Sequence, residues 1–127
     1  MPQQNNSRQQ DLRERTNRFA IEVIRFCRKL PNNAEGWVIG KQLLRSGTSV
    51  AANYRAAQRA RSHAEFLAKI GIVVEEADET VFWLDLLGTA GTVPNDSIEK
   101  LRNEARELTA IFTSSYHTAK SKATGAR

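Results

Sequence analysis

Residues 37–87 read WVIGKQLLRSGTSVAANYRAAQRARSHAEFLAKIGIVVEEADETVFWLDLL, and this stretch decides the fold. Before Ser62 it is basic and contains no acid, whereas after Ser62 it gathers acids against one base, Lys69. In the basic half, small and apolar residues recur at spacings of three and four: Gly36, Ile39, Leu43, Gly47, Val50, Tyr54 and Ala57. In the acidic half the same spacing continues: Phe66, Ile70, Val73, Ala77, Val81 or Thr80, Leu84 and Leu87. This period predicts two helices of opposite charge.

The joint between these two helices is marked by a capping box, Ser62-His63-Ala64-Glu65. In such a box the serine oxygen accepts the backbone N–H of the glutamate, and the carboxylate reaches back towards the cap. The acidic helix is therefore expected to begin directly after Ser62.

Two further stripes of helical period flank the central pair. The first comprises Leu12, Thr16, Phe19, Val23, Phe26 and Leu30, and Pro31 ends it. The last comprises Ile98, Leu101, Ala105, Leu108, Phe112 and Ser115. Four amphipathic helices with short connections predict an all-α fold, an antiparallel up-down-up-down four-helix bundle.

The 127 residues are enough for one domain with one core. We expect the bundle domain to span residues 11–117. The Gln/Asn-rich residues 1–10 are expected to form a disordered lead-in, and the small, polar and basic residues 118–127 a disordered tail.

Composition limits the location and the class of partner. No apolar run approaches the roughly 20 residues that a membrane span needs, so no membrane partner is expected. The start of the chain shows no signal peptide, and the single cysteine, Cys27, cannot form an internal disulfide, so a cytoplasmic protein is expected. The formal net charge of +5 permits a polyanionic partner without requiring one.

A polar set on the two central helices is the most suggestive cluster. Arg45 and Asn53 lie eight residues apart on one helix, and Glu76 and Glu79 lie one turn apart on the next. Antiparallel packing would bring Arg45 towards Glu79 or its neighbours. An arginine–carboxylate contact there would fix the register of the helices or a subunit interface, and we favour this structural role over ligand binding or catalysis.

A metal or catalytic site has little support in the sequence. Di-iron bundles use Glu-x-x-His pairs, and the chain contains none. His63 and His117 sit at predicted helix ends, and Cys27 lies beside an apolar stripe. We therefore expect no metal, no cofactor and no enzymatic activity.

The basic central helix is a candidate nucleic-acid surface. Its exposed cations are expected to be Lys41, Arg55, Arg59 and Arg61. Clustered Lys and Arg side chains neutralise phosphates with little sequence specificity. The alternative, that these cations pair with the acidic helix within or between subunits, is about equally consistent with the residues.

Adjacent aromatic residues point to self-association. Phe82 and Trp83 cannot both face the bundle centre because neighbouring helical positions point in different directions. We expect one of them, with Trp83 as the candidate, to lie in a subunit interface, where aromatic residues are enriched.

The central stretch also resembles a known family. The residues that carry the resemblance are Gln42-Leu43-Leu44-Arg45-Ser46-Gly47-Thr48-Ser49-Val50-Ala51-Ala52-Asn53-Tyr54, followed by Glu65-Phe66, Glu75-Glu76-Ala77-Asp78-Glu79-Thr80 and Phe82-Trp83-Leu84. They are similar to those of the four-helix bundle proteins first found encoded in intervening sequences of bacterial 23S ribosomal RNA genes. Many members carry an acid and a glycine after the Asn-hydrophobic pair, where this chain has Arg55-Ala56.

The resemblance, which covers about residues 11–112, has implications for fold and assembly. It implies an antiparallel four-helix bundle that assembles into a ring, most simply a homopentamer. A similar bundle is the accessory protein of diversity-generating retroelements, in which a basic pentamer works with a reverse transcriptase and nucleic acid.

The sequence thus favours a non-enzymatic oligomeric bundle that scaffolds RNA, DNA or a nucleic-acid enzyme. A structural or protein-interaction module without nucleic-acid contact is the competing interpretation. An enzyme or metal carrier built on the Glu-rich helix is the weakest.

Overall fold

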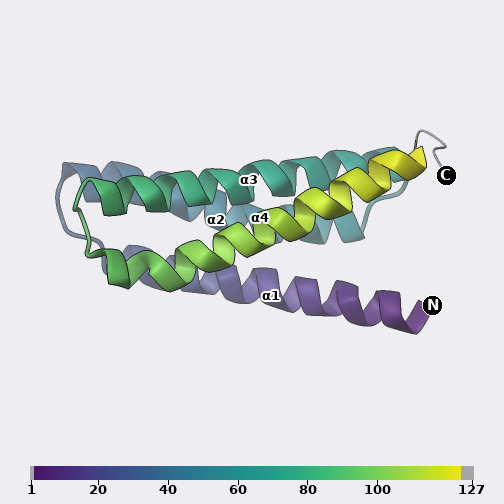
Figure 1. Cartoon of the computed structure of the whole chain (residues 1–127), viewed down its shortest axis with the longest axis horizontal. Helices are drawn as coiled ribbons and strands as arrows, with labels where there is room; N and C mark the ends of the chain where they lie inside the picture. The colour runs from purple at the N-terminus through teal and green to yellow at the C-terminus, as the bar shows by residue number, and fades with distance from the viewer. Residues whose placement is uncertain (1, 124–127) are drawn as a thin grey trace.

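The computed structural model describes the backbone of residues 2–123 and the side chains of residues 7–122. It contains four helices: α1 (Pro2–Arg28), α2 (Ala34–Gln58), α3 (His63–Thr89) and α4 (Asn95–Ala123). Figure 1 shows that consecutive helices run in opposite directions, with both ends of the chain at one end of the bundle and the α1–α2 and α3–α4 connections at the other. The predicted four-helix bundle is confirmed.

The outer helices extend beyond their predicted limits. α1 begins at Pro2 instead of near Asp11, so the expected disordered lead-in is helical over residues 2–10. The Tyr54 hydroxyl and the Gln58 side-chain amide both lie within hydrogen-bond distance of the Gln9 carbonyl, at 3.5 and 3.2 Å, and hold this part of α1 against α2. The lead-in lacks an apolar stripe, but this tertiary contact supplies partners that composition does not reveal.

α4 likewise continues to Ala123, past the predicted end of the bundle at residue 117. The buried Ala119 belongs to this extension, and its carbonyl lies 2.8 Å from Nε2 of His63 at the start of α3. The expected disordered tail is therefore helical up to residue 123, and its last part, residues 124–127, lies outside the described residues.

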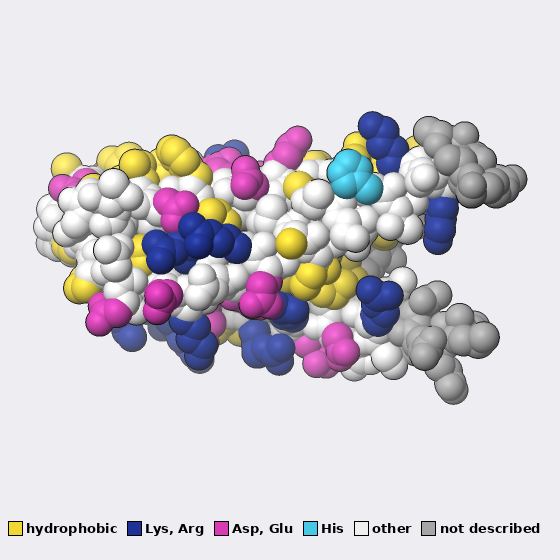
Figure 2. All heavy atoms as spheres, viewed as in Figure 1, with side chains coloured by type: hydrophobic (Ala, Val, Ile, Leu, Met, Phe, Trp, Pro, Cys, Tyr) yellow, Lys and Arg dark blue, Asp and Glu magenta, His cyan; other side chains and the backbone are white. Residues whose placement is uncertain are grey.

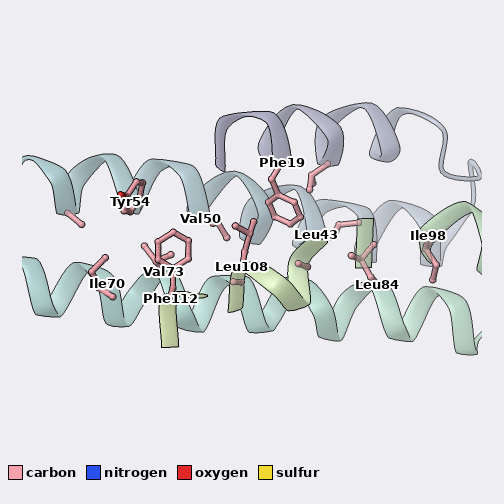
Figure 3. Packing of buried hydrophobic residues seen from close by; sticks show 14 of the residues in the cluster. Phe19, Leu43, Val50, Tyr54, Ile70, Val73, Leu84, Ile98, Leu108 and Phe112 are labelled. Atoms are coloured by element: carbon pink, nitrogen blue, oxygen red, sulfur yellow. The ribbon is translucent and has the colours of Figure 1, made fainter. Parts of the chain in front are cut away.

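The core is formed by all four helices, as the predicted stripes require, and α1 contributes the buried Phe19 and Val23 to it. Figure 3 shows Val50 and Tyr54 of α2 facing Ile70 and Val73 of α3, with the ring of Phe112 between them. The Tyr54 and Phe112 ring centroids are 5.1 Å apart. Burial of these large apolar side chains is the main term that stabilises the fold.

α1 packs on α2 through small residues of α2. A Cβ placed on Gly47 would lie 2.7 Å from Cγ2 of the buried Val23, and one placed on Gly40 would lie 2.8 Å from Cδ1 of Leu30. The glycines therefore let the two helices approach closely.

α1 and α4 touch much less than the other neighbouring pairs. Figure 1 shows α4 crossing obliquely, so that its C-terminal half lies away from α1. Near the middle, Arg15 bridges the two helices by binding the carboxylates of Glu104 at 2.7 Å and Glu107 at 2.8 Å. A groove of about 900 Å³ lies between the C-terminal half of α1 and the start of α4, and Phe26, Leu30 and Leu101 are among its lining residues.

The predicted capping box forms at the start of α3. The Ser62 hydroxyl accepts the backbone N–H of Glu65 at 3.0 Å, as expected. The Glu65 carboxylate accepts the backbone N–H of Arg61 at 2.7 Å instead of that of Ser62. The box therefore joins the α2–α3 connection to the first turn of α3.

Replacing Ser62 with alanine is expected to lower the free energy of unfolding by about 1 kcal/mol, because a helix N-terminal N–H loses its acceptor. Chemical denaturation of the Ser62→Ala variant measures this loss. Ser62→Asp keeps an acceptor and should retain wild-type stability. Equal stability of all three proteins would show that the cap contributes nothing.

Candidate nucleic-acid interface

The predicted basic surface is exposed along α2 and the connection that follows it. Lys41, Arg55, Arg59 and Arg61 are all exposed to solvent. Among the described residues, Lys41, Arg55 and Arg59 form no ion pair, and Arg61 pairs only with Glu65, at 3.6 Å. Pairing with the acidic helix of the same subunit therefore does not account for the charge of this surface.

Four cations of this region share one shallow depression of about 380 Å³. It lies where the end of α2 meets the beginning of α3. Its lining residues are Ala52, Arg55, Ala56, Arg59, Arg61, Glu65 and Lys69. Lys69 is the member that sequence reasoning missed, because it lies in the acidic helix. The position of Lys69 in the sequence could have indicated this. In an antiparallel hairpin the second turn of one helix, which holds Lys69, lies beside the last turn of the other, which holds Arg55.

Glu65 supplies the one carboxylate among the lining residues of the depression, and this carboxylate already accepts a hydrogen bond from Arg61. The pKa of Glu65 is lowered, first because the Arg61 backbone N–H donates to its carboxylate and then because of the charge of Arg61. The charge of Lys69 also lowers the pKa of Glu65, so Glu65 stays charged at neutral pH. Neither Arg55, Arg59 nor Lys69 forms an ion pair with a described residue, and these cations can bind an external anion.

The predicted polar set on α2 and α3 is not joined into one network. Asn53 donates its side-chain amide to the Ser49 carbonyl of its own helix at 2.9 Å. Glu79 accepts the Trp83 indole N–H at 3.1 Å. No ion pair joins Arg45 to either acid among the residues that the structure describes. The pKa of Glu76 is raised, mainly by burial and then by the Glu79 carboxylate, and the charge of Arg45 opposes this shift.

The buried polar contact between α2 and α3 involves different residues. The hydroxyls of Ser46 and Thr80, both fully buried, lie 2.9 Å apart. Each also lies near a carbonyl of its own helix, Leu43 at 3.3 Å and Glu76 at 2.8 Å. Such a satisfied pair in a helix interface fixes the register of the helices.

A second surface, at the end of the bundle where α2 begins and α3 ends, is apolar. Val38, Phe82 and Leu86 are 57%, 53% and 38% exposed, and Trp83 is half-buried beside them. The Phe82 and Trp83 rings meet edge to face with centroids 4.8 Å apart. Figure 2 shows apolar side chains gathered along the upper edge at this end. We call Val38, Phe82, Trp83 and Leu86 the apolar patch.

The side chains that could bind a metal or act as nucleophiles do not form a cluster among the described residues. Within residues 7–122 no three His, Cys, Asp or Glu side chains come close enough to share a metal ion. Cys27 lies half-buried with its Sγ 3.6 Å from the Gly40 carbonyl, and burial raises the pKa of its thiol to about 11. The thiol is therefore protonated at neutral pH. None of the described helices is long and apolar enough to cross a membrane.

Fold and surface together define the class of protein: a small antiparallel four-helix bundle with an exposed basic face and a separate apolar patch. The chain belongs to the 23S rRNA-intervening sequence protein family, whose family model matches residues 8–114. The resemblance seen in the central stretch is thereby confirmed.

A solved structure supports the same assignment. The chain is similar to a protein of unknown function from the S23 ribosomal protein family of Bacteroides thetaiotaomicron, with 34% sequence identity and a TM-score of 0.77. The similarity covers 82% of this chain and 96% of that one. No curated protein matches the chain.

Proposed function

We propose that this protein is a non-enzymatic, self-associating scaffold that binds RNA or DNA through the basic surface of α2. The observation that carries the proposal is that Lys41 and Arg55 of α2, and Arg59 directly after it, are exposed and form no ion pair with any residue that the structure describes. Cations that have no partner within the fold are available to the phosphates of a nucleic acid.

Self-association is the second part of the proposal, with a homopentamer as the assembly that the family resemblance implies. The apolar patch supports it, because a solvent-facing phenylalanine beside a half-buried tryptophan is typical of an interface and costly to leave in water. Assembly would repeat the basic surface in every subunit and so strengthen binding to an extended polyanion. We also propose a cytoplasmic location, for which the single cysteine is the support.

The second candidate function is a protein-interaction module without nucleic-acid contact. The apolar patch favours it as well, because the patch suits a different protein partner as well as a second copy. Nucleic-acid binding by the purified protein separates the two functions.

The double variant Arg55→Gln/Arg59→Gln is expected to bind a short RNA or DNA duplex up to about thirtyfold more weakly than the wild type, at about 1 kcal/mol for each lost phosphate contact. The slope of log K against log salt should fall by about 1.8 for DNA, since each contact contributes about 0.9. Fluorescence anisotropy at a series of salt concentrations measures both quantities.

The matched control is Lys100→Gln/Lys122→Gln, which removes the same charge from exposed positions of α4. It should leave affinity and salt slope near their wild-type values. If both double variants weaken binding equally, net charge alone governs the interaction and α2 is not its surface. If the wild type does not bind either duplex, the interaction-module function replaces the scaffold.

A further inference from the structure

We propose that the depression between the end of α2 and the start of α3 is a binding site for a phosphate group, completed by Lys69 of the otherwise acidic helix. The inference rests on the proposed nucleic-acid binding and names the place where a backbone phosphate is held. It assigns a role in binding to Lys69, which lies on α3 and not on the basic helix α2.

The shape of the depression suits a small anion. Ala52 and Ala56 lie one turn apart on α2 and line it together with longer side chains. Because their side chains are small, a ligand atom can approach the backbone of α2 between the cations. Arg55 lies in the last turn of α2, and Arg59 follows directly after the last helical residue, Gln58.

The charges of the depression converge from three segments. α2 contributes Arg55, the connection contributes Arg59 and Arg61, and α3 contributes Lys69. Against these four cations stands one carboxylate, Glu65, which accepts the Arg61 backbone N–H. Lys69 lies one turn beyond Glu65 and forms no ion pair with a described residue. A net positive depression of this kind attracts an anion.

The chemistry of the side chains identifies the anion as a phosphate. Guanidinium groups offer forked donors that match two phosphate oxygens, and an ammonium group acts as a mobile point charge beside them. The first turn of α3 borders the depression with Glu65, and the positive end of its helix dipole adds to the attraction. The phosphate can come from a nucleic-acid backbone or from a small free phosphate.

The Lys69→Gln variant tests the proposal, because it leaves every cation of α2 in place. We expect its affinity for a DNA duplex to fall about fivefold, the effect of one exposed phosphate contact, and its salt slope to fall by about 0.9. Lys69→Arg should restore both values. Lys100→Gln, which removes one exposed charge from the start of α4, should match the wild type.

Two experiments distinguish failure of the phosphate site from failure of the proposed scaffold function, and a nucleic-acid phosphate from a free phosphate. If the wild type binds the duplex and Lys69→Gln binds it equally well, the phosphate site is refuted and the proposed scaffold function stands. If the wild type does not bind the duplex, the scaffold function fails. Titration with inorganic phosphate then decides: amide NMR shifts at Ala56 and Lys69 that vanish in Lys69→Gln support a site for free phosphate, and their absence refutes it.

Discussion

Replacing Gly47 with leucine is expected to destabilise the bundle by about 3 kcal/mol, because there is no room for a side chain where α2 meets α1. A Cβ at this position would lie 2.7 and 2.8 Å from the two Cγ atoms of Val23 and 3.1 Å from its Cβ. Val23 is fully buried, and as a β-branched residue it has few rotamers with which to move away. The gain in helix propensity from losing a glycine, about 0.8 kcal/mol, offsets only part of this cost.

Chemical denaturation at a fixed protein concentration measures this loss, since assembly makes apparent stability depend on concentration. The matched control is the double variant Gly47→Leu/Val23→Ala. Removing the two methyl groups of Val23 makes room for the leucine, so the double variant should be more stable than the sum of the single effects predicts. A Gly47→Leu protein as stable as the wild type would contradict the close α1–α2 packing.

Replacing Phe82 with glutamate is expected to dissociate the proposed oligomer into monomers of 14.2 kDa without loss of helix. Phe82 is 53% exposed, so the carboxylate of the introduced glutamate is hydrated in the monomer. In the assembly it would be buried in an apolar interface, which is unfavourable. Trp83→Ala should act in the same direction, because it removes the ring on which Phe82 packs edge to face. Light scattering gives the mass, and far-ultraviolet circular dichroism gives the helix content.

The control for this substitution is Ile21→Glu. Ile21 is 45% exposed on α1, away from the apolar patch, and its replacement should leave the assembly intact. Dissociation by Ile21→Glu together with an unchanged oligomer in Phe82→Glu would place the interface on α1 and contradict the assignment.

The fold was largely predictable because helical periodicity records burial directly. Leu43, Val50 and Tyr54 of α2, and Ile70 and Val73 of α3, were placed on core stripes from spacing alone, and all are buried. The start of α1 was not predictable in this way. Its first turns carry polar residues without a stripe, and its contact with α2 depends on the Gln9 carbonyl, which the side-chain pattern does not reveal.

The basic surface was predictable from composition, but the side-chain contacts between α2 and α3 were not. Arg45 was expected to lie towards Glu79 or its neighbours, and its charge does act on Glu76. The rotation of each helix about its axis decides which side chains form hydrogen bonds. That rotation brings Ser46 to Thr80, and it leaves Glu79 to accept the Trp83 indole. Lys69 was missed for a related reason: it belongs to an acidic helix by sequence and to a basic depression in space.

The measurement that tests the account most directly is light scattering on the purified full-length protein, alone and with short RNA and DNA duplexes, at low and high salt. We expect an oligomer, with the pentamer as the expected size, that binds duplex at low salt and releases it at high salt. A protein that stays monomeric, or an oligomer that binds neither duplex at low salt, would contradict it.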